Sequence, residues 1–170
     1  MIPQTPWIER KFEFNFPVGL FPVIIERLRG TISQLDDMVK DLPEAKLSSR
    51  PAEKWSIKEV VGHLYDIEGL WNRRISDFLE HKETLHAADM SNSRTHESDH
   101  NAQLIHVLLK QFRESRISLI SRVENMDETT ACLTALHPRL QKPMRLVDSL
   151  FFAAEHDDHE LTKIRNLIKT

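Results

Sequence analysis

The sequence predicts an all-α protein, a four-helix bundle, and two observations carry that prediction. Only four glycines and one tyrosine accompany long stretches rich in Leu, Glu, Lys and Arg, a composition that favours helices over a many-stranded sheet. In four segments of the chain, apolar residues recur at three- and four-residue steps, which is the helical period. Amphipathic helices of this kind bury their apolar faces most simply against one another, as a bundle.

The first two helices are separated by a segment that contains proline. The first helix is expected over residues 17–42, and prolines interrupt the helical pattern in the connection 42–54. A capping box then marks the second helix: the Ser56 side chain accepts a hydrogen bond from the Glu59 amide, and the Glu59 side chain accepts one from the Ser56 amide. The second helix therefore begins there and is expected to end at residues 78–80.

The rest of the chain is assigned by the same signals. Residues 1–15 show no clear period and are expected to form an arm packed on the body, and the polar segment 81–94 is expected to be a long loop. The third helix is expected over residues 95–123. Pro143 is placed as the first residue of the fourth helix, which extends nearly to Thr170, because proline is favoured at that position.

Length and charge limit the possible partners and locations. At 170 residues the chain is expected to form one domain, residues 1–170. A net charge of -3 provides no basic surface for nucleic acid, and no run of about 18 uncharged apolar residues is present to span a membrane. The single cysteine, Cys132, cannot form an internal disulfide, and no basic-then-apolar start marks a secretory signal, so a cytoplasmic location is expected.

The composition includes nine histidines, which prompt a search for metal-ligand spacing. His156 and Glu160 are one turn apart on the flank of the last helix's apolar stripe, so one helix can present both to one ion. His63 borders the stripe of the second helix, whereas His159 points away from the core. Two His and a carboxylate bind Zn²⁺, Ni²⁺, Mn²⁺ or Fe²⁺ with positions open for water or substrate. A hydrogen-bonded role at the edge of the core is the more common alternative for such a histidine.

Two blocks of the sequence carry a resemblance to a known family. They are Lys54-Trp55-Ser56-Ile57-Lys58-Glu59 with Gly62-His63-Leu64 and Asp66-x-Glu68-x-x-Trp71, and Ala154-Glu155-His156-Asp157-Asp158-His159-Glu160-Leu161. With these blocks the sequence resembles the DinB/YfiT-like proteins over nearly the whole chain. The resemblance implies a four-helix bundle, commonly dimeric, in which one His of the second helix and an i, i+4 His pair of the fourth helix bind a divalent metal.

Carried over residue by residue, the resemblance gives His63 and His156 as two ligands. Glu160 stands at the third position, which is usually His, so the site is either more anionic, with a different metal preference, or weakened or lost. His159 replaces Glu160 only if the helix rotates or unwinds locally. On helical phase, the predicted metal ligands are His63, His156 and Glu160, and the predicted cofactor is a divalent metal: Zn, Ni, Mn or Fe.

Glu68 lies near the centre of the second helix's apolar stripe, where an unpaired carboxylate is costly. A salt bridge or hydrogen bond to an Arg such as Arg113 or Arg116 is the preferred expectation. The alternative is a role beside the metal ligands or in acid–base chemistry.

A second candidate motif lies before the third helix. His96-Glu97-Ser98-Asp99-His100 is a literal H-E-x-x-H, the zinc signature of metalloproteases, in which it lies within a long active-site helix. Here the motif lies at the expected first turn of the third helix, where the helix dipole favours acidic residues, so a protease is not preferred. His100 is kept as a candidate contact to the metal ligands or the substrate. No role is assigned to His81, His86, His106, His137 or Cys132.

The leading hypothesis is a metal-dependent hydrolase or thiol transferase that acts on a small molecule. The metal would polarise a carbonyl or lower the pKa of a water or thiol, and thiol transfer is included by resemblance alone. The competing hypothesis is a non-catalytic dimeric bundle, a binding or stress-related module with a degenerate metal site. Phe151 and Phe152 make the last helix apolar over more than one face, which favours a homodimer.

Overall fold

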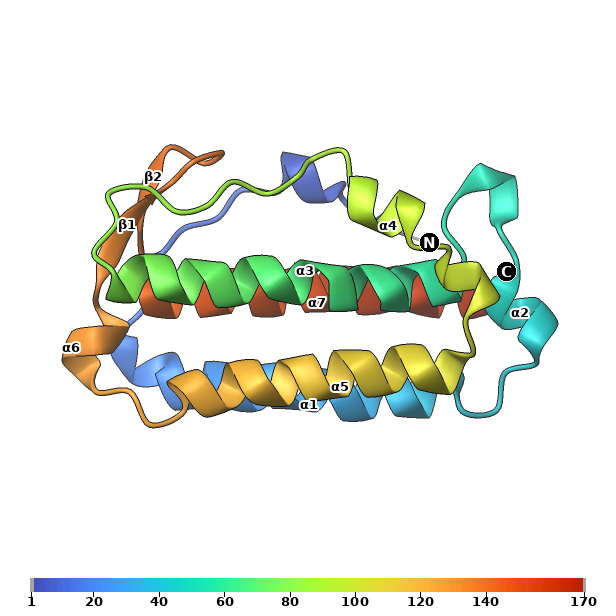
Figure 1. Ribbon diagram of the computed structural model, residues 1–170. Helices are drawn as coiled ribbons and strands as arrows, with labels where there is room; N and C mark the ends of the chain where they lie inside the picture. Colours follow the sequence, from blue (N-terminus) through green and yellow to red (C-terminus); the bar gives the residue numbers. More distant parts are fainter. Residues whose placement is uncertain (1, 170) are drawn as a thin grey trace.

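Four long helices form the body of the protein in the computed structural model, which describes residues 2–169. They are α1 (Phe21–Val39), α3 (Ile57–Leu79), α5 (Ile105–Val123) and α7 (Leu146–Lys169). Helices α3 and α1 each pack against both α5 and α7, so the helices form a closed four-cornered bundle (Figure 1). The predicted four-helix bundle is confirmed.

Short elements connect the long helices. The short α-helices are α2 (Glu44–Ser48), α4 (Ser93–Glu97) and α6 (Glu128–Ala131). The 3-10 helices are η1 (Trp7–Glu9), η2 (Val18–Leu20), η3 (Pro51–Glu53) and η4 (His100–Ala102). The strands β1 (Thr134–His137) and β2 (Lys142–Arg145) form an antiparallel hairpin between α6 and α7.

The predicted capping box fixes the start of α3. The Ser56 side chain accepts from the Glu59 amide at 3.2 Å, and the Ser56 amide donates to Glu59 Oε2 at 2.8 Å. Both groups belong to the first turn, where backbone amides have no partner within the helix. The start of α3 sets the helical phase of every side chain that follows on it, including His63.

Pro143 does not begin the last helix, which corrects the prediction. It lies in β2 opposite Leu136, and β1 also forms a bridge with Thr84, so β2 is the edge strand and tolerates a residue without an amide hydrogen. The helix begins three residues later, where the Asp148 carboxylate accepts from the Arg145 amide at 2.8 Å. A hairpin was not expected from the helical period alone.

The third long helix begins at Ile105 and not at Thr95, a second correction. Asp99 has a φ of 43°, in the left-handed region, and Gln103 is extended, so the chain breaks twice between α4 and α5. His96 lies on α4 and His100 on η4, so the H-E-x-x-H residues do not share one helix. The geometry of a metalloprotease helix is therefore not formed.

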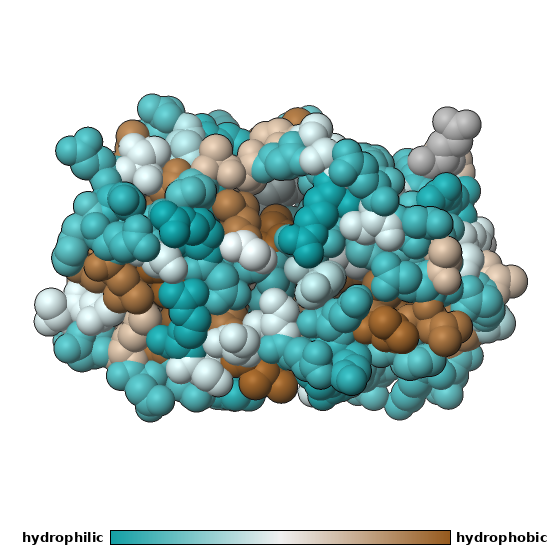
Figure 2. Space-filling model, in the orientation of Figure 1, coloured by the Kyte–Doolittle hydropathy of each residue, from teal (hydrophilic) through white to brown (hydrophobic). Residues whose placement is uncertain are grey.

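The N-terminal segment runs antiparallel along α7 and covers its aromatic face. Phe12 packs on Phe152 with ring centroids 4.8 Å apart, and Phe16 packs on Phe151 at 5.0 Å. The apolar residues that favoured a second subunit are thus covered by the chain itself, and the homodimer stays a prediction. Figure 2 shows a mainly hydrophilic face with scattered apolar patches. Within residues 2–169, no helix is both long enough and apolar enough to span a membrane.

Candidate metal centre

The three predicted ligands meet in the interior of the bundle. His63 projects from α3, and His156 and Glu160 project from successive turns of α7; all three side chains are buried. One ligand atom of each lies within 4.8 Å of the other two. His63 Nε2 is 3.4 Å from His156 Nε2, which is 3.7 Å from Glu160 Oε1. The structure therefore brings together two imidazoles and one carboxylate from two facing helices.

Hydrogen bonds determine which nitrogen of His63 faces this cluster. The Thr95 hydroxyl donates to Asp66 Oδ2 at 2.9 Å, so its oxygen is left to accept from His63 Nδ1 at 3.2 Å. His63 therefore carries its proton on Nδ1 and presents the Nε2 lone pair to His156 and Glu160. A His that donates its second ring nitrogen to a fixed acceptor is the usual arrangement of a metal ligand.

Asp66 is itself held by two further groups. His100 Nε2 lies 2.8 Å from Asp66 Oδ2, and Arg94 Nε lies 3.1 Å from Oδ1. The His100 ring packs so closely on α3 that a Cβ added to Gly62 would lie 2.2 Å from its Cγ. His100 thus touches the support of His63 and not the cluster itself, and Gly62 makes room for it.

The two histidines of the cluster are in the protonation state that a metal ligand needs. Burial, together with the nearby Lys163 ammonium, lowers the pKa of His63 to about 4. Burial also holds the pKa of His156 well below its usual value. Both rings are therefore neutral at pH 7 and keep a lone pair, the state in which imidazole binds metals.

Glu160 is the least satisfied member of the cluster. Burial raises its pKa, and the Lys163 ammonium, 2.8 Å from Oε1, acts in the opposite direction. Its other oxygen, Oε2, is buried without a hydrogen-bond partner within residues 2–169. A buried carboxylate oxygen in this state is costly unless a cation or donor meets it.

The donor set fits a divalent transition metal. Ligand atoms at about 2.1 Å from a shared ion lie roughly 3.4 Å apart in a tetrahedral arrangement. The separations of 3.4 and 3.7 Å in the cluster match that spacing. Neutral imidazole and carboxylate suit Zn²⁺, Ni²⁺, Mn²⁺ and Fe²⁺.

His159, the alternative ligand, faces away from the cluster as the helical phase predicted. Gln4 donates to its backbone carbonyl at 2.9 Å and contacts its Nδ1 at 2.9 Å. The Trp7 ring lies 5.6 Å from the His159 ring. His159 is buried under the N-terminal segment and does not join His63, His156 and Glu160.

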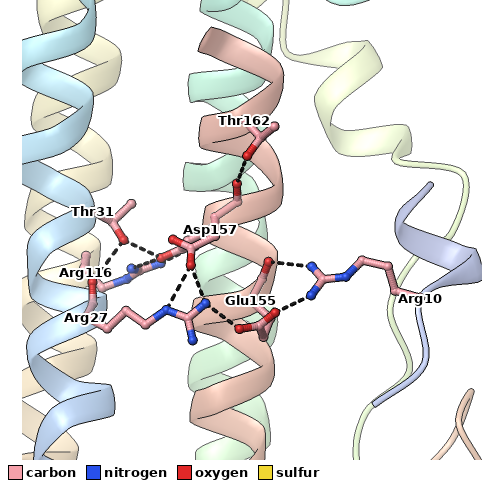
Figure 3. Close-up of polar contacts among 8 residues, drawn as sticks. Arg10, Arg27, Thr31, Arg116, Glu155, Asp157 and Thr162 are labelled. Carbon is pink, nitrogen blue, oxygen red and sulfur yellow. Dashed lines mark hydrogen bonds and ion pairs between the residues drawn. The ribbon is translucent and has the colours of Figure 1, made fainter. Parts of the chain in front are cut away.

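Glu68 has the partner that its position required. Arg116 donates to Glu68 Oε1 at 2.6 Å and also binds Asp157, whose carboxylate accepts from Thr31 at 2.8 Å. The other candidate, Arg113, pairs with Asp36 at the surface instead. Figure 3 shows Arg116 and Thr31 meeting at Asp157. Glu68 therefore belongs to a structural ion-pair network.

Two cavities flank the metal cluster, and the sequence indicated neither. One is a cleft of about 780 Å³ whose wall includes Lys163 and Trp55; Trp55 packs on the His63 ring at 4.9 Å. The other is a pocket of about 220 Å³ whose wall includes His156 and Trp71. Loops and the N-terminal segment complete both cavities, and helical periodicity carries no information about their position.

By fold and by side chains, the protein is a four-helix bundle with a buried cluster of two His and one carboxylate. A model of the DinB superfamily matches residues 27–163, and the chain belongs to that superfamily. The structure of YfiT from Bacillus subtilis superposes with a TM-score of 0.82 at 16% identity, over 95% of this chain and 93% of that one. At this identity the likeness shows a shared fold. YfiT is described as a probable metal-dependent hydrolase with an unusual four-helix bundle topology. No curated protein sequence matches the chain.

Proposed function

We propose that this protein binds one divalent metal ion through His63, His156 and Glu160 and acts as a metal-dependent hydrolase of a small molecule. The observation that carries the proposal is the convergence of two neutral imidazoles and a carboxylate in the core, with Glu160 Oε2 unpaired within the described residues. Membership of the DinB superfamily and the description of YfiT agree with it. The cation is Zn²⁺, Ni²⁺, Mn²⁺ or Fe²⁺.

Bound there, such an ion would supply a Lewis acid for a carbonyl, a water or a thiol. The chain prepares the site for it: Asp66 and Thr95 hold the His63 ring so that Nε2 faces the cluster. Lys163 binds Glu160 Oε1 and also lines the large cleft. Its ammonium is therefore positioned to stabilise negative charge that develops on a substrate in that cleft.

Two alternatives from the sequence predict different results. Thiol transfer, implied by the family resemblance, would use the same ion and a thiol in place of water. A non-catalytic bundle with a degenerate site would hold no metal. The homodimer and the cytoplasmic location also stay predictions.

Elemental analysis of the purified protein, prepared without a histidine tag or chelator, tests the metal site. We expect near-stoichiometric Zn, Ni, Mn or Fe in the parent and its loss in His63→Ala and Glu160→Ala. His159→Ala is the matched control, because it removes a buried His one residue from Glu160 that faces away from the cluster. A parent that stays without metal after reloading would overturn the proposal and favour the non-catalytic bundle.

Activity is tested on the same proteins. Panels of small amides, esters and thiol acceptors should show turnover that depends on the reloaded metal and disappears in His63→Ala. Turnover that survives in the His63→Ala protein would place the reaction elsewhere in the molecule. Turnover only with thiol acceptors would favour the transferase.

A further inference from the structure

A small pocket on the far side of His156 from the large cleft is unusually rich in buried donors. Its volume is about 220 Å³, and its wall includes Trp71 and Arg74 of α3, His137 and Arg139 of the hairpin, and His156 of α7. Apolar side chains of the N-terminal segment and of the α3–α4 connection complete it. Figure 2 shows apolar side chains within a hollow of this face, where these two segments cross above α3.

The unpaired polar atoms of the protein concentrate in this wall. Eight buried side-chain nitrogen or oxygen atoms lack a hydrogen-bond partner within residues 2–169, and five of them belong to residues of this pocket. They are Trp71 Nε1, Arg74 Nη1, His137 Nε2, Arg139 Nη2 and His156 Nδ1. Arg74 and His137 are each 1% exposed, so neither group reaches bulk solvent.

The tautomer of His137 makes its free nitrogen a donor. Its Nδ1 accepts from the backbone amides of Arg139 at 3.2 Å and Leu140 at 3.1 Å, in the turn between the strands. The ring proton therefore lies on Nε2, which has no hydrogen-bond partner in the described part of the chain. Indole Nε1 and the guanidinium nitrogens of Arg can only donate. Four of the five unpaired atoms, all except His156 Nδ1, are thus hydrogen-bond donors that cannot accept.

The charge of the pocket is also one-sided. No Asp or Glu lines it, while two guanidinium groups do. Burial lowers the pKa of Arg74 to about 10, with the Asp77 carboxylate behind the wall acting in the opposite direction and Arg139 in the same one, so Arg74 remains a cation at pH 7. The same two cations add to burial in lowering the pKa of His137 to about 3, so that ring is neutral. A wall of donors and positive charge with no carboxylate in its lining forms a site for an anion.

We infer that this pocket binds an oxyanionic group of the substrate, a carboxylate or a phosphate, between Arg74 and Arg139 with Trp71 and His137 as further donors. The inference rests on the proposed function in one respect only, that the anion belongs to the molecule turned over at the metal cluster. A volume of about 220 Å³ admits one such group with a few attached atoms.

The pocket is connected to the metal cluster through side-chain contacts. Arg74 lies over the Trp71 ring with its guanidinium carbon 5.5 Å from the centroid, and Trp71 meets the His156 ring at 5.9 Å. Along α3, residues 63, 67, 71 and 74 follow the helical period, so His63 and Arg74 share one face at a separation of roughly 16 Å of helix rise. A substrate anchored at Arg74 would direct its other end toward His156 and His63.

Binding of simple anions to the full-length protein tests the inference. Isothermal titration calorimetry would use inorganic phosphate, acetate and succinate at constant ionic strength in chloride, on the protein as purified and after metal reloading. In parallel, the indole N–H signal of Trp71 would be followed by NMR, with that of Trp55 as an internal control outside the pocket. We expect saturable binding and a shift of the Trp71 signal alone or with Trp7.

Three pocket variants and one control identify the site. Arg139→Gln and Arg74→Gln should each weaken binding by at least about tenfold, because each removes one charge-assisted contact. His137→Asn should weaken it less, since an Asn oxygen can replace Nδ1 as the acceptor in the turn while the Nε2 donor is lost. Arg122→Gln, an exposed arginine that binds Asn72 and Ser76, should leave the affinity unchanged. Arg139 is less buried than Arg74, so its variant keeps the test valid if the Arg74 variant fails to fold.

The outcomes separate this inference from the metal proposal. Stronger phosphate binding would support a phosphorylated substrate, and stronger acetate or succinate binding would support a carboxylate. No saturable binding, or binding unchanged in the Arg139 and Arg74 variants, would overturn the inference even if the protein holds metal. Anion binding in a protein that holds no metal would support the anion site and contradict only the proposed hydrolase activity.

Discussion

Two buried polar clusters both include side chains of α3 and α7 and differ in how their charges are satisfied. Around Arg116, one guanidinium binds Glu68 of α3 and Asp157 of α7, and all three side chains are fully buried. Around His156, one residue before Asp157, the neighbouring groups are neutral rings and a carboxylate oxygen without a partner. In the first cluster each charged group has an oppositely charged partner inside the fold, although Glu68 Oε2 has no hydrogen-bond partner within residues 2–169. The second leaves lone pairs directed at one point, the arrangement expected where a ligand completes the set.

Removing Arg116 should have the largest effect on stability. Arg116→Met leaves Glu68 and Asp157 as unpaired buried carboxylates, which should lower the free energy of unfolding by about 3–5 kcal/mol. Urea denaturation followed by circular dichroism measures this change. Adding Glu68→Gln and Asp157→Asn to the variant should recover part of the loss, because the two buried charges are then gone.

Arg113 provides the matched control for Arg116. It lies three residues earlier on α5 and pairs with Asp36 at the surface, where both side chains are more than a third exposed. Arg113→Met should therefore change the free energy of unfolding by about 1 kcal/mol or less. Equal losses in the two variants would contradict the view that the Arg116 network differs from an ordinary surface pair.

The support of His63 should matter for metal binding more than for folding. Thr95→Val removes the acceptor of His63 Nδ1, and loss of such a contact typically weakens metal affinity by about 10–100-fold. Competition with a chromophoric chelator measures the affinity, and urea denaturation of the metal-free protein should show a loss of about 1–3 kcal/mol, the cost of one buried donor without an acceptor. Thr162→Val is the control, because that exposed hydroxyl donates to the Asp158 carbonyl on α7, away from the cluster. An unchanged metal affinity in Thr95→Val would show that Thr95 and Asp66 do not support the metal ligand His63.

Helical phase explains what could be predicted from the sequence. The capping box at Ser56 set the phase of His63, and the period of the last helix separated Glu160 from His159. The same phase placed Glu68 in the core, and its partner is one of the two arginines named. These residues lie within long helices, where position on a face follows from residue number alone.

Features formed by connections could not be predicted in this way. Thr95 and His100 reach the site because the chain breaks at Asp99, and His137 and Arg139 reach the pocket because a hairpin replaces the expected start of the helix at Pro143. Pro143 is compatible with either a helix start or an edge strand, and only the pairing of β1 with β2 decides between them. Positions in loops depend on tertiary contacts that have no periodic signal.

The neutral His137 should make the fold sensitive to acid. Its folded pKa is about 3 against an ordinary 6.5, so between these values the unfolded chain binds a proton that the folded chain does not. Stability from this group is therefore lost as pH falls from about 6.5 toward 3, by less than about 1.4 kcal/mol for each pH unit. His137→Asn should flatten the dependence of the unfolding free energy on pH in that window. Identical slopes for parent and variant would show that His137 takes up its proton normally in the fold.

The smallest expected effect compares two acidic residues three positions apart on α7. In metal-free protein, Glu160→Gln removes a buried carboxylate whose Oε2 has no partner within residues 2–169 and whose cationic partner, Lys163, is partly exposed. The unfolding free energy should stay unchanged or rise by up to about 1 kcal/mol. Asp157→Asn should instead lower it, because Arg116 loses one of its two carboxylates. Urea denaturation in the presence of chelator measures both variants, and equal losses would place Glu160 in the structural network. If Glu160→Gln leaves folding intact but abolishes metal binding, the two clusters have different roles. Asp157 then stabilises the fold, whereas burying Glu160 costs free energy that only a bound ligand offsets.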